Sequence, residues 1–149
     1  VTAFDPILQQ QGGRIVVSDI PDVMADESAL RHAMHNLVAN ALKYAHPERP
    51  PMVRIDGALQ GDRVRVSVSD NGLGIPLDAR EQVFEMGVQL TPGSQGIGLG
   101  LPSVRNVVQA NGGQVWVEDG PDGVGTTIVL SLPTPADVQI ALDQPPTHR

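Results

Sequence analysis

The sequence predicts a single domain of the α/β class. Segments that alternate between apolar and polar residues, as half-buried strands do, are interspersed with segments that have the apolar period of a helix. A length of 149 residues suits one hydrophobic core. We place the domain at residues 1–132, because prolines and glutamines dilute the pattern from Pro133 onward. Residues 133–149 are expected to form a partly disordered tail.

The first predicted elements are a strand and a long helix. Residues Arg14–Ile20 are rich in β-branched side chains, and Pro21 closes that strand. Asp26 is a suitable N-cap for the helix. The helix should stop near His46 and Pro47, since residues before proline avoid helical dihedrals. Its core-facing period is formed by Leu30, Ala33, Met34, Leu37, Val38, Ala41 and Leu42.

The remaining elements alternate in the same way. A β-hairpin is predicted because two alternating segments flank a short turn that contains Gly61. A proline in its first turn favours the last helix. In chain order the predictions are strands at Met52–Leu59 and Arg63–Ser69, a short helix at Leu77–Phe84, a helix at Pro102–Ala110, and strands at Gln114–Glu118 and Thr126–Leu132.

Composition excludes several classes of function. A formal net charge of −7 without a run of lysines and arginines argues against nucleic-acid binding. The absence of cysteine excludes disulfides, thiolate metal sites and cysteine nucleophiles. No apolar run approaches the roughly 20 residues that cross a bilayer, so we expect a cytoplasmic domain without membrane contact. Because the chain begins at Val1 and not at methionine, we expect a fragment of a larger protein.

A glycine-rich segment precedes the last predicted helix. Three glycines at alternate positions, interleaved with aliphatic residues, let an anionic group approach bare backbone where a helix starts. The segment therefore indicates a phosphate site, with tight packing as the alternative interpretation. It consists of Gly96, Ile97, Gly98, Leu99, Gly100 and Leu101.

Three polar residues share one face of the long helix. Asn36, Asn40 and Lys43 follow the spacing i, i+4, i+7. Asparagine is a poor helix former, so two of them one turn apart sacrifice helix propensity for paired amides. Mg²⁺ prefers such oxygen ligands, and Lys43 is a candidate cation for a phosphate. A solvated helix face is the alternative interpretation.

A carboxylate ends the second strand of the hairpin. Val64, Val66 and Val68 share one face, and the period of two places Asp70 on the same side. A carboxylate there needs a donor, since burying an unpaired charge is costly. The exocyclic amine of a purine would supply that donor, although Asp70 could instead cap its own turn. The expected walls around a flat ring are Gly72, Gly74 and Tyr44.

These motifs, in this order, resemble the ATP-binding catalytic domain of sensor histidine kinases, whose Bergerat-type nucleotide fold is shared with gyrase B, Hsp90 and MutL. The resemblance runs from about Phe4 to Leu132. The matching segments are Asn36–Tyr44 (N box), Asp70–Pro76 (first glycine box), Val83–Glu85 (F box), Gly96–Leu101 (second glycine box) and Gly125–Thr127.

The resemblance implies a two-layer α/β sandwich, in which a mixed β-sheet is covered on one face by helices. It implies ATP and Mg²⁺ as ligands, with Asn40 as the metal ligand and Asn36 and Lys43 near the phosphates. Asp70 would accept from the adenine amine, and Thr126 would support the base. Gly74 and Ile75 would contact the base, and the segment Gly87–Gln95 would form a lid over the nucleotide.

The resemblance also implies a reaction and partners. Relatives that hydrolyse ATP carry a glutamate where this chain has Asn36, and an amide cannot accept a proton from water. We therefore expect phosphoryl transfer to a histidine on a separate dimerisation domain. A response regulator is expected to act through the parent protein. The fragment should be a monomer and the parent a homodimer.

Two alternatives stay open. One is a stand-alone serine kinase of the anti-sigma type, although such proteins usually carry the glutamate that is missing here. The other is a non-catalytic nucleotide sensor, which is suggested by the absence of lysine and arginine between Phe84 and Leu101.

Overall fold

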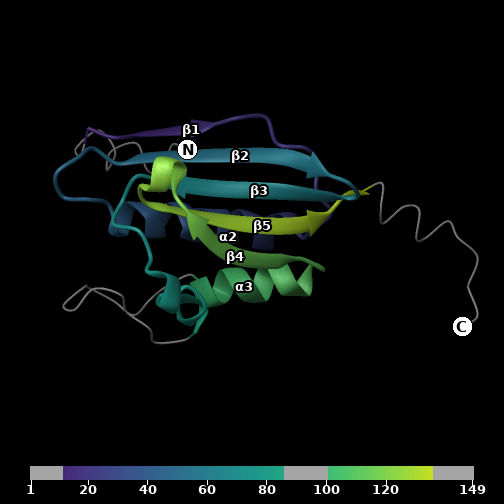
Figure 1. The fold of residues 1–149 in the computed structure, drawn as a ribbon. Helices are drawn as coiled ribbons and strands as arrows, with labels where there is room; N and C mark the ends of the chain where they lie inside the picture. The colour runs from purple at the N-terminus through teal and green to yellow at the C-terminus, as the bar shows by residue number, and fades with distance from the viewer. Residues whose placement is uncertain (1–11, 86–100, 136–149) are drawn as a thin grey trace, which may run out of the picture.

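The computed structural model describes residues 12–85 and 101–135. These residues form one sheet, two α-helices and three short 3-10 turns (Figure 1). The elements are β1 (Arg14–Val17), α2 (Glu27–Lys43), β2 (Met52–Gln60), β3 (Arg63–Asp70), η2 (Leu77–Ala79), η3 (Gln82–Phe84), α3 (Leu101–Ala110), β4 (Gln114–Asp119), η4 (Pro121–Gly123) and β5 (Thr126–Pro133).

The five strands form a mixed sheet in the order β1-β2-β3-β5-β4. β1 pairs with β2 in parallel, and the other neighbours are antiparallel. The register aligns the buried face across the sheet, since Ile55 lies opposite Val68 and Val68 opposite Ile128. The last strand of the described chain, β5, therefore lies inside the sheet (Figure 1). The predicted α/β fold with a mixed sheet is confirmed.

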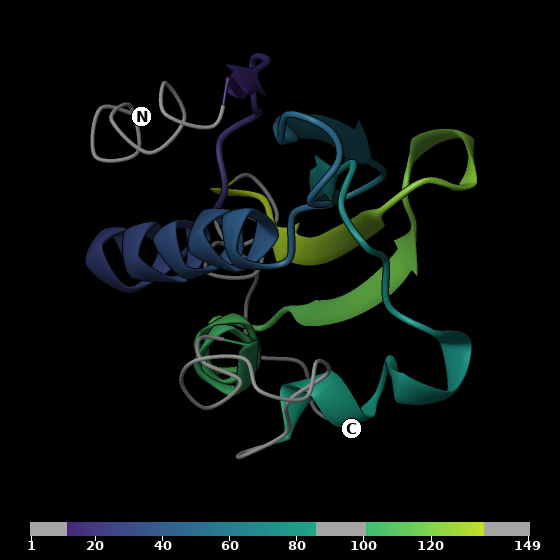
Figure 2. The ribbon, with the colours of Figure 1, turned by 90° about the vertical axis from the view of Figure 1, so that its left-hand side faces the viewer.

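Both α-helices pack against the same face of the sheet, which gives two layers (Figure 2). The side chain of Asp26 begins α2 by accepting a hydrogen bond from the Ala29 amide at 3.0 Å, as the N-cap prediction requires. None of the helices within the described residues is long and apolar enough to cross a membrane. The core between the layers contains Leu37, Val38, Val53, Val64, Val68, Val104, Val108, Leu130 and Leu132.

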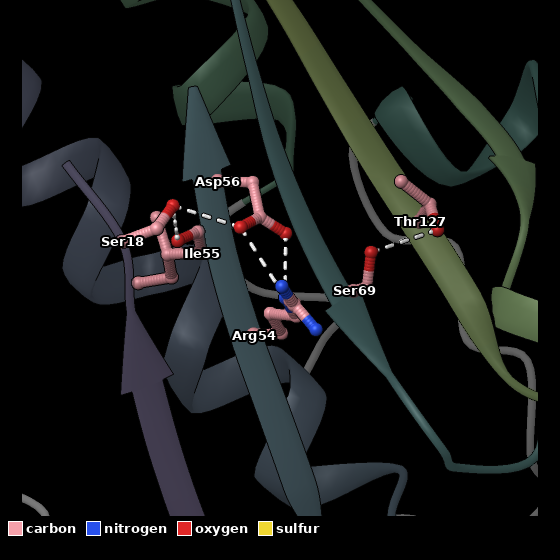
Figure 3. Close-up of polar contacts among 6 residues, drawn as sticks. All are labelled: Ser18, Arg54, Ile55, Asp56, Ser69 and Thr127. Carbon is pink, nitrogen blue, oxygen red and sulfur yellow. Dashed lines mark hydrogen bonds and ion pairs between the residues drawn. The ribbon is translucent and has the colours of Figure 1, made fainter. Parts of the chain in front are cut away.

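The opposite face of the sheet carries polar side chains that pair with one another (Figure 3). The hydroxyl of Ser18 donates to Asp56 at 2.8 Å, and Arg54 forms an ion pair with the same carboxylate. The hydroxyls of Ser69 and Thr127 lie 3.0 Å apart across β3 and β5. These polar side chains consequently find hydrogen-bond or ion-pair partners on the same face.

Three elements differ from the predictions by more than one residue. β1 ends at Val17 and not at Ile20, because Ile20 turns to pack against Gly57, where a Cβ would lie 2.7 Å from its side chain. α2 ends at Lys43, since the Tyr44 carbonyl accepts from Leu73 in a neighbouring loop. The helix predicted at 77–84 is instead two separate 3-10 turns.

Candidate functional site

A small cavity lies between the C-terminal half of α2 and the adjoining ends of β3 and β5. Its volume is about 20 Å³, which is room for about one water molecule. A larger ligand therefore requires the surrounding side chains to move. The cavity is lined by Leu37, Asn40, Ala41, Tyr44, Val68, Asp70, Gly74, Ile75, Thr126 and Ile128.

The structure brings together several of the residues that the motifs single out. From three separate parts of the chain, the cavity wall collects Asn40, Tyr44, Asp70, Gly74, Ile75 and Thr126. Asn36, Lys43 and Gly72 do not line this cavity. The glycines Gly96, Gly98 and Gly100, with Ile97 and Leu99, lie outside the described residues, as does the predicted lid at Gly87–Gln95. Leu101 is buried at the start of α3.

Asp70 caps its own turn at the end of β3, and its carboxylate also binds the start of β5. Its Oδ1 atom accepts from the Gly72 amide at 2.9 Å, which caps the turn, and from the Thr126 amide at 3.2 Å. Its Oδ2 atom accepts from none of the described residues. Burial raises the pKa of Asp70, and the two amide hydrogen bonds partly oppose that rise. The carboxylate is thus held in place through its Oδ1 atom.

The loop after Asp70 fits tightly against its neighbours. A Cβ at Gly72 would lie 2.5 Å from the Tyr44 carbonyl oxygen, so this position tolerates no larger residue. The Leu73 amide donates to that same carbonyl at 3.1 Å. Gly125 has a φ of +76°, and a Cβ there would lie 2.0 Å from the Asp70 carbonyl oxygen. These close approaches join the end of α2, the loop and the start of β5.

Asn36 and Lys43 lie on α2 beside the cavity. Lys43 is exposed, and its ammonium lies 5.4 Å from the centroid of the Tyr44 ring. It lines a neighbouring cavity of about 280 Å³ together with His46 and Arg49. Residues three or four apart are neighbours on a helix surface, so Asn36 and Lys43 both flank Asn40. Of the polar stripe formed by Asn36, Asn40 and Lys43, only Asn40 lines the cavity.

Sequence reasoning missed two groups of residues at this site. The apolar lining of Leu37, Ala41, Val68 and Ile128 was identified only as core, because periodicity shows which face is buried and not where a cavity opens. Arg49 and Arg80, which bind the loop after Asp70, belong to no motif. Side chains that bind distant backbone carbonyls produce no local pattern.

Comparison with known proteins identifies the family. Residues 25–136 match the model of the family described as histidine kinase-, DNA gyrase B-, and HSP90-like ATPase. The chain belongs to this family. The methanogenesis regulatory histidine kinase FilI of Methanothrix harundinacea is 34% identical over 115 residues, which are 77% of this chain and 13% of FilI. The chain therefore spans a small part of the length of this relative.

Solved structures agree with the sequence relatives. The mycobacterial sensor histidine kinase MprB is 30% identical, with a TM-score of 0.72 and coverage of 89% of both chains. ShkA, solved at full length in complex with AMPPNP, is 35% identical, with a TM-score of 0.73 and coverage of 89% of this chain and 28% of ShkA. The resemblance to histidine-kinase catalytic domains that the motifs predict is confirmed.

Proposed function

We propose that this chain binds Mg-ATP in the cavity beside Asp70 and supplies the γ-phosphoryl group to a histidine on a dimerisation domain outside the chain. The observation that carries the proposal is the state of the Asp70 carboxylate. One oxygen is fixed by two backbone amides, and the other has no donor among the described residues. The exocyclic amine of adenine can supply the hydrogen-bond donor that this oxygen lacks.

The base would lie between α2 and the sheet. Leu37, Ala41 and Ile128 supply apolar surface for a flat ring, and Tyr44 adds the only aromatic side chain of the wall. Gly74 and Ile75 would contact the ring edge. The Thr126 amide would act through Asp70, because it holds the carboxylate. Guanine has a carbonyl where adenine has its amine, so this arrangement favours adenine.

The phosphates of the bound nucleotide would extend out of the cavity along the polar stripe of α2. Asn40 lines the cavity and would ligate Mg²⁺, and Asn36 and Lys43 flank it on the helix surface. The described residues contain no group of three or more histidine, aspartate or glutamate side chains that could hold a metal. A site with Asn40 as its protein ligand suits Mg²⁺, which keeps several waters and takes few protein ligands. When bound, Mg²⁺ neutralises charge on the phosphate oxygens.

The protein groups favour transfer over hydrolysis. Asp70 is the only carboxylate in the described cavity wall, and it lies at the base end. Asn36, one turn before the proposed metal ligand, cannot accept a proton from an attacking water. The contribution of the chain is therefore to orient ATP and to place the Lys43 charge beside Asn40. The glycines and aliphatic residues of Gly96–Leu101 would hold the phosphates through backbone amides.

Partners and location follow from the same proposal. The acceptor is a histidine-bearing dimerisation domain, and a response regulator receives the phosphoryl group through a parent protein that is a homodimer. The domain works in the cytoplasm, where ATP is available. We assign the ATP-binding unit to residues 1–132 and the tail to 133–149, although Pro133 already belongs to β5.

Two assays on the purified chain test this function. Titration calorimetry should show Mg-ATP binding and much weaker Mg-GTP binding. A phosphate-release assay should show negligible turnover, whereas labelled phosphate should appear on a histidine-bearing dimerisation domain from a related kinase when it is added. Equal affinity for ATP and GTP would contradict the role of Asp70. Steady Mg²⁺-dependent phosphate release that Asn40→Ala abolishes would place the chain among ATPases.

A further inference from the structure

The loop between Asp70 and η2 is held by two arginines. The Nε atom of Arg49 donates to the carbonyl of Asn71 at 2.7 Å, and its Nη2 atom donates to the carbonyl of Gly72 at 3.3 Å. On the other side, Nε of Arg80 donates to the carbonyl of Ile75 at 3.1 Å. Three carbonyls of one six-residue loop therefore accept from guanidinium groups.

Each arginine ties the loop to a different part of the fold. Arg49 lies in the segment that follows α2, and the Asn71 side chain strengthens the same junction. Its Oδ1 atom accepts from the Met52 amide at 2.9 Å, and its Nδ2 atom donates to the Pro50 carbonyl at 3.1 Å. The connection between α2 and β2 is consequently fastened to the end of β3.

Arg80 ties the other end of the loop to β4. Its guanidinium forms an ion pair with Asp119, the last residue of that strand. The Arg80 side chain is only 19% exposed, whereas that of Asp119 is 74% exposed. The arginine is thus fixed mainly by burial and by the Ile75 carbonyl, while its partner remains in solvent.

A loop with two glycines has much conformational freedom to lose. Glycine is required at 72 because a Cβ there would collide with the Tyr44 carbonyl, and at 74 because the φ of Gly74 is +81°. Neither glycine can therefore be replaced to make the loop more rigid. The same loop carries the amide that fixes Asp70 and two residues of the cavity wall. External bonds to its carbonyls limit its motion without altering the residues that face the cavity.

We propose that Arg49 and Arg80 are positioning residues that hold this loop in its nucleotide-binding conformation. Neither side chain lines the cavity, so each acts through the loop backbone. The inference rests on the proposed ATP site. Preorganisation lowers the ordering cost that a ligand must otherwise meet on binding.

The test compares Arg49→Met, Arg80→Met and the double variant with Arg31→Met. Arg31 is an exposed arginine at the other end of α2 whose ion pair is with Glu27. Calorimetry with Mg-ADP should show affinity lowered about threefold by each single change and about tenfold by both. Arg31→Met should leave affinity unchanged. Arg49→Lys should recover part of the loss, because one amine can still donate to a carbonyl.

Asp119→Ala separates the ion pair from the loop bond. It removes the partner of Arg80 but leaves the bond to Ile75, so we expect a smaller loss of affinity than with Arg80→Met. Equal losses in these two variants would show that the ion pair, and not the loop bond, matters.

Hydrogen exchange in the absence of nucleotide provides an independent readout. The amides of residues 70–75 should exchange faster in Arg49→Met and Arg80→Met, with protection in α2 and β5 retained. Unchanged exchange in the loop, or unchanged Mg-ADP affinity in the double variant, would overturn the inference. Failure of the wild-type chain to bind Mg-ADP would instead refute the proposed function, and the exchange comparison would still report on the two arginines.

Discussion

The Oδ1 atom of Asp70 accepts a hydrogen bond from the backbone amide of Thr126, 56 residues away in the chain. This bond crosses the antiparallel pair of β3 and β5 at the end where the cavity opens. It fixes the orientation of the carboxylate before any ligand arrives. Asp70 is therefore held by the sheet itself as well as by its own turn.

Asp70→Asn should weaken ATP binding by about 1–3 kcal/mol without loss of the fold. The amide oxygen of asparagine can still accept from Gly72 and Thr126, but the free oxygen is replaced by an NH₂ group that opposes the adenine amine. Calorimetry on both proteins measures the difference. Equal ATP affinity would refute the assignment of Asp70 to adenine.

The same variant has an expected pH signature. Burial raises the folded pKa of Asp70 above its ordinary value of 3.8, so the folded state binds the proton more tightly than the unfolded state. The free energy of unfolding contributed by this group falls as pH rises from 3.8 through the folded pKa. Asp70→Asn removes this ionisation, so it should melt at or above the wild-type temperature at pH 7. Its advantage should shrink in acid.

Asn40→Ala should remove the Mg²⁺-dependent part of ATP binding and leave adenosine binding nearly intact. Asn40 lies on α2 at the proposed phosphate end, whereas the base lies against Asp70. Titrations with ATP in Mg²⁺, ATP in EDTA, and adenosine separate these contributions. Asn106→Ala, which changes an exposed asparagine on α3, is the matched control. Equal losses for ATP and adenosine would indicate damage to the fold.

Bound Mg-ATP should protect Lys43 from acylation by an amine-reactive reagent. It is the only lysine in the sequence, so an amine-reactive reagent has one side-chain target and the N-terminal amine as an internal reference. We expect the Lys43 acetylation rate measured by mass spectrometry to fall severalfold at saturating Mg-ATP, because a phosphate would engage the ammonium. Protection by adenosine to the same extent would show that Lys43 senses the base or the fold and not the phosphates.

Glu118→Gln should lower thermal stability at neutral pH but not in strong acid. Hydrogen bonds from Arg65 and, to a smaller extent, from Trp116 lower the pKa of Glu118 below its ordinary value of 4.5. Its stabilising contribution is therefore complete above 4.5 and is lost as pH falls through the lower folded pKa. Melting curves of the two proteins should converge as pH drops below 4.5. Glu48→Gln, at an exposed residue without an ion pair to a described residue, should run parallel to wild type throughout.

The regular parts of this fold are readable from the sequence because their signals are local. The apolar period of α2 and its Asp26 cap predict the helix, and alternation in β2 and β3 predicts the hairpin. The two 3-10 turns at 77–84 were predicted as one helix. An eight-residue segment has too few i to i+4 bonds for periodicity to distinguish the two, and tertiary contacts decide.

The candidate site likewise contains features that the sequence predicts and features that it does not. The inward direction of Asp70 follows from the period of β3, and the motifs locate Asn40, Gly74 and Thr126. The pairing of Asp70 with Thr126 depends on which strand lies beside β3, and strand order has no local signal. Arg49 and Arg80 act on backbone carbonyls, which every residue offers alike, so no residue pattern identifies them.

The insertion of β5 between β3 and β4 has a consequence for biosynthesis. A nascent chain that has not yet released residues 126–133 from the ribosome already contains α2, the β2–β3 hairpin and Asp70. It still lacks the inner strand on which β3 and β4 both pair. Such long-range pairings form late, because the intervening chain must close first. At the proposed site, nucleotide therefore meets its full set of contacts only after synthesis has passed β5, which supplies Thr126 and Ile128 to the cavity wall.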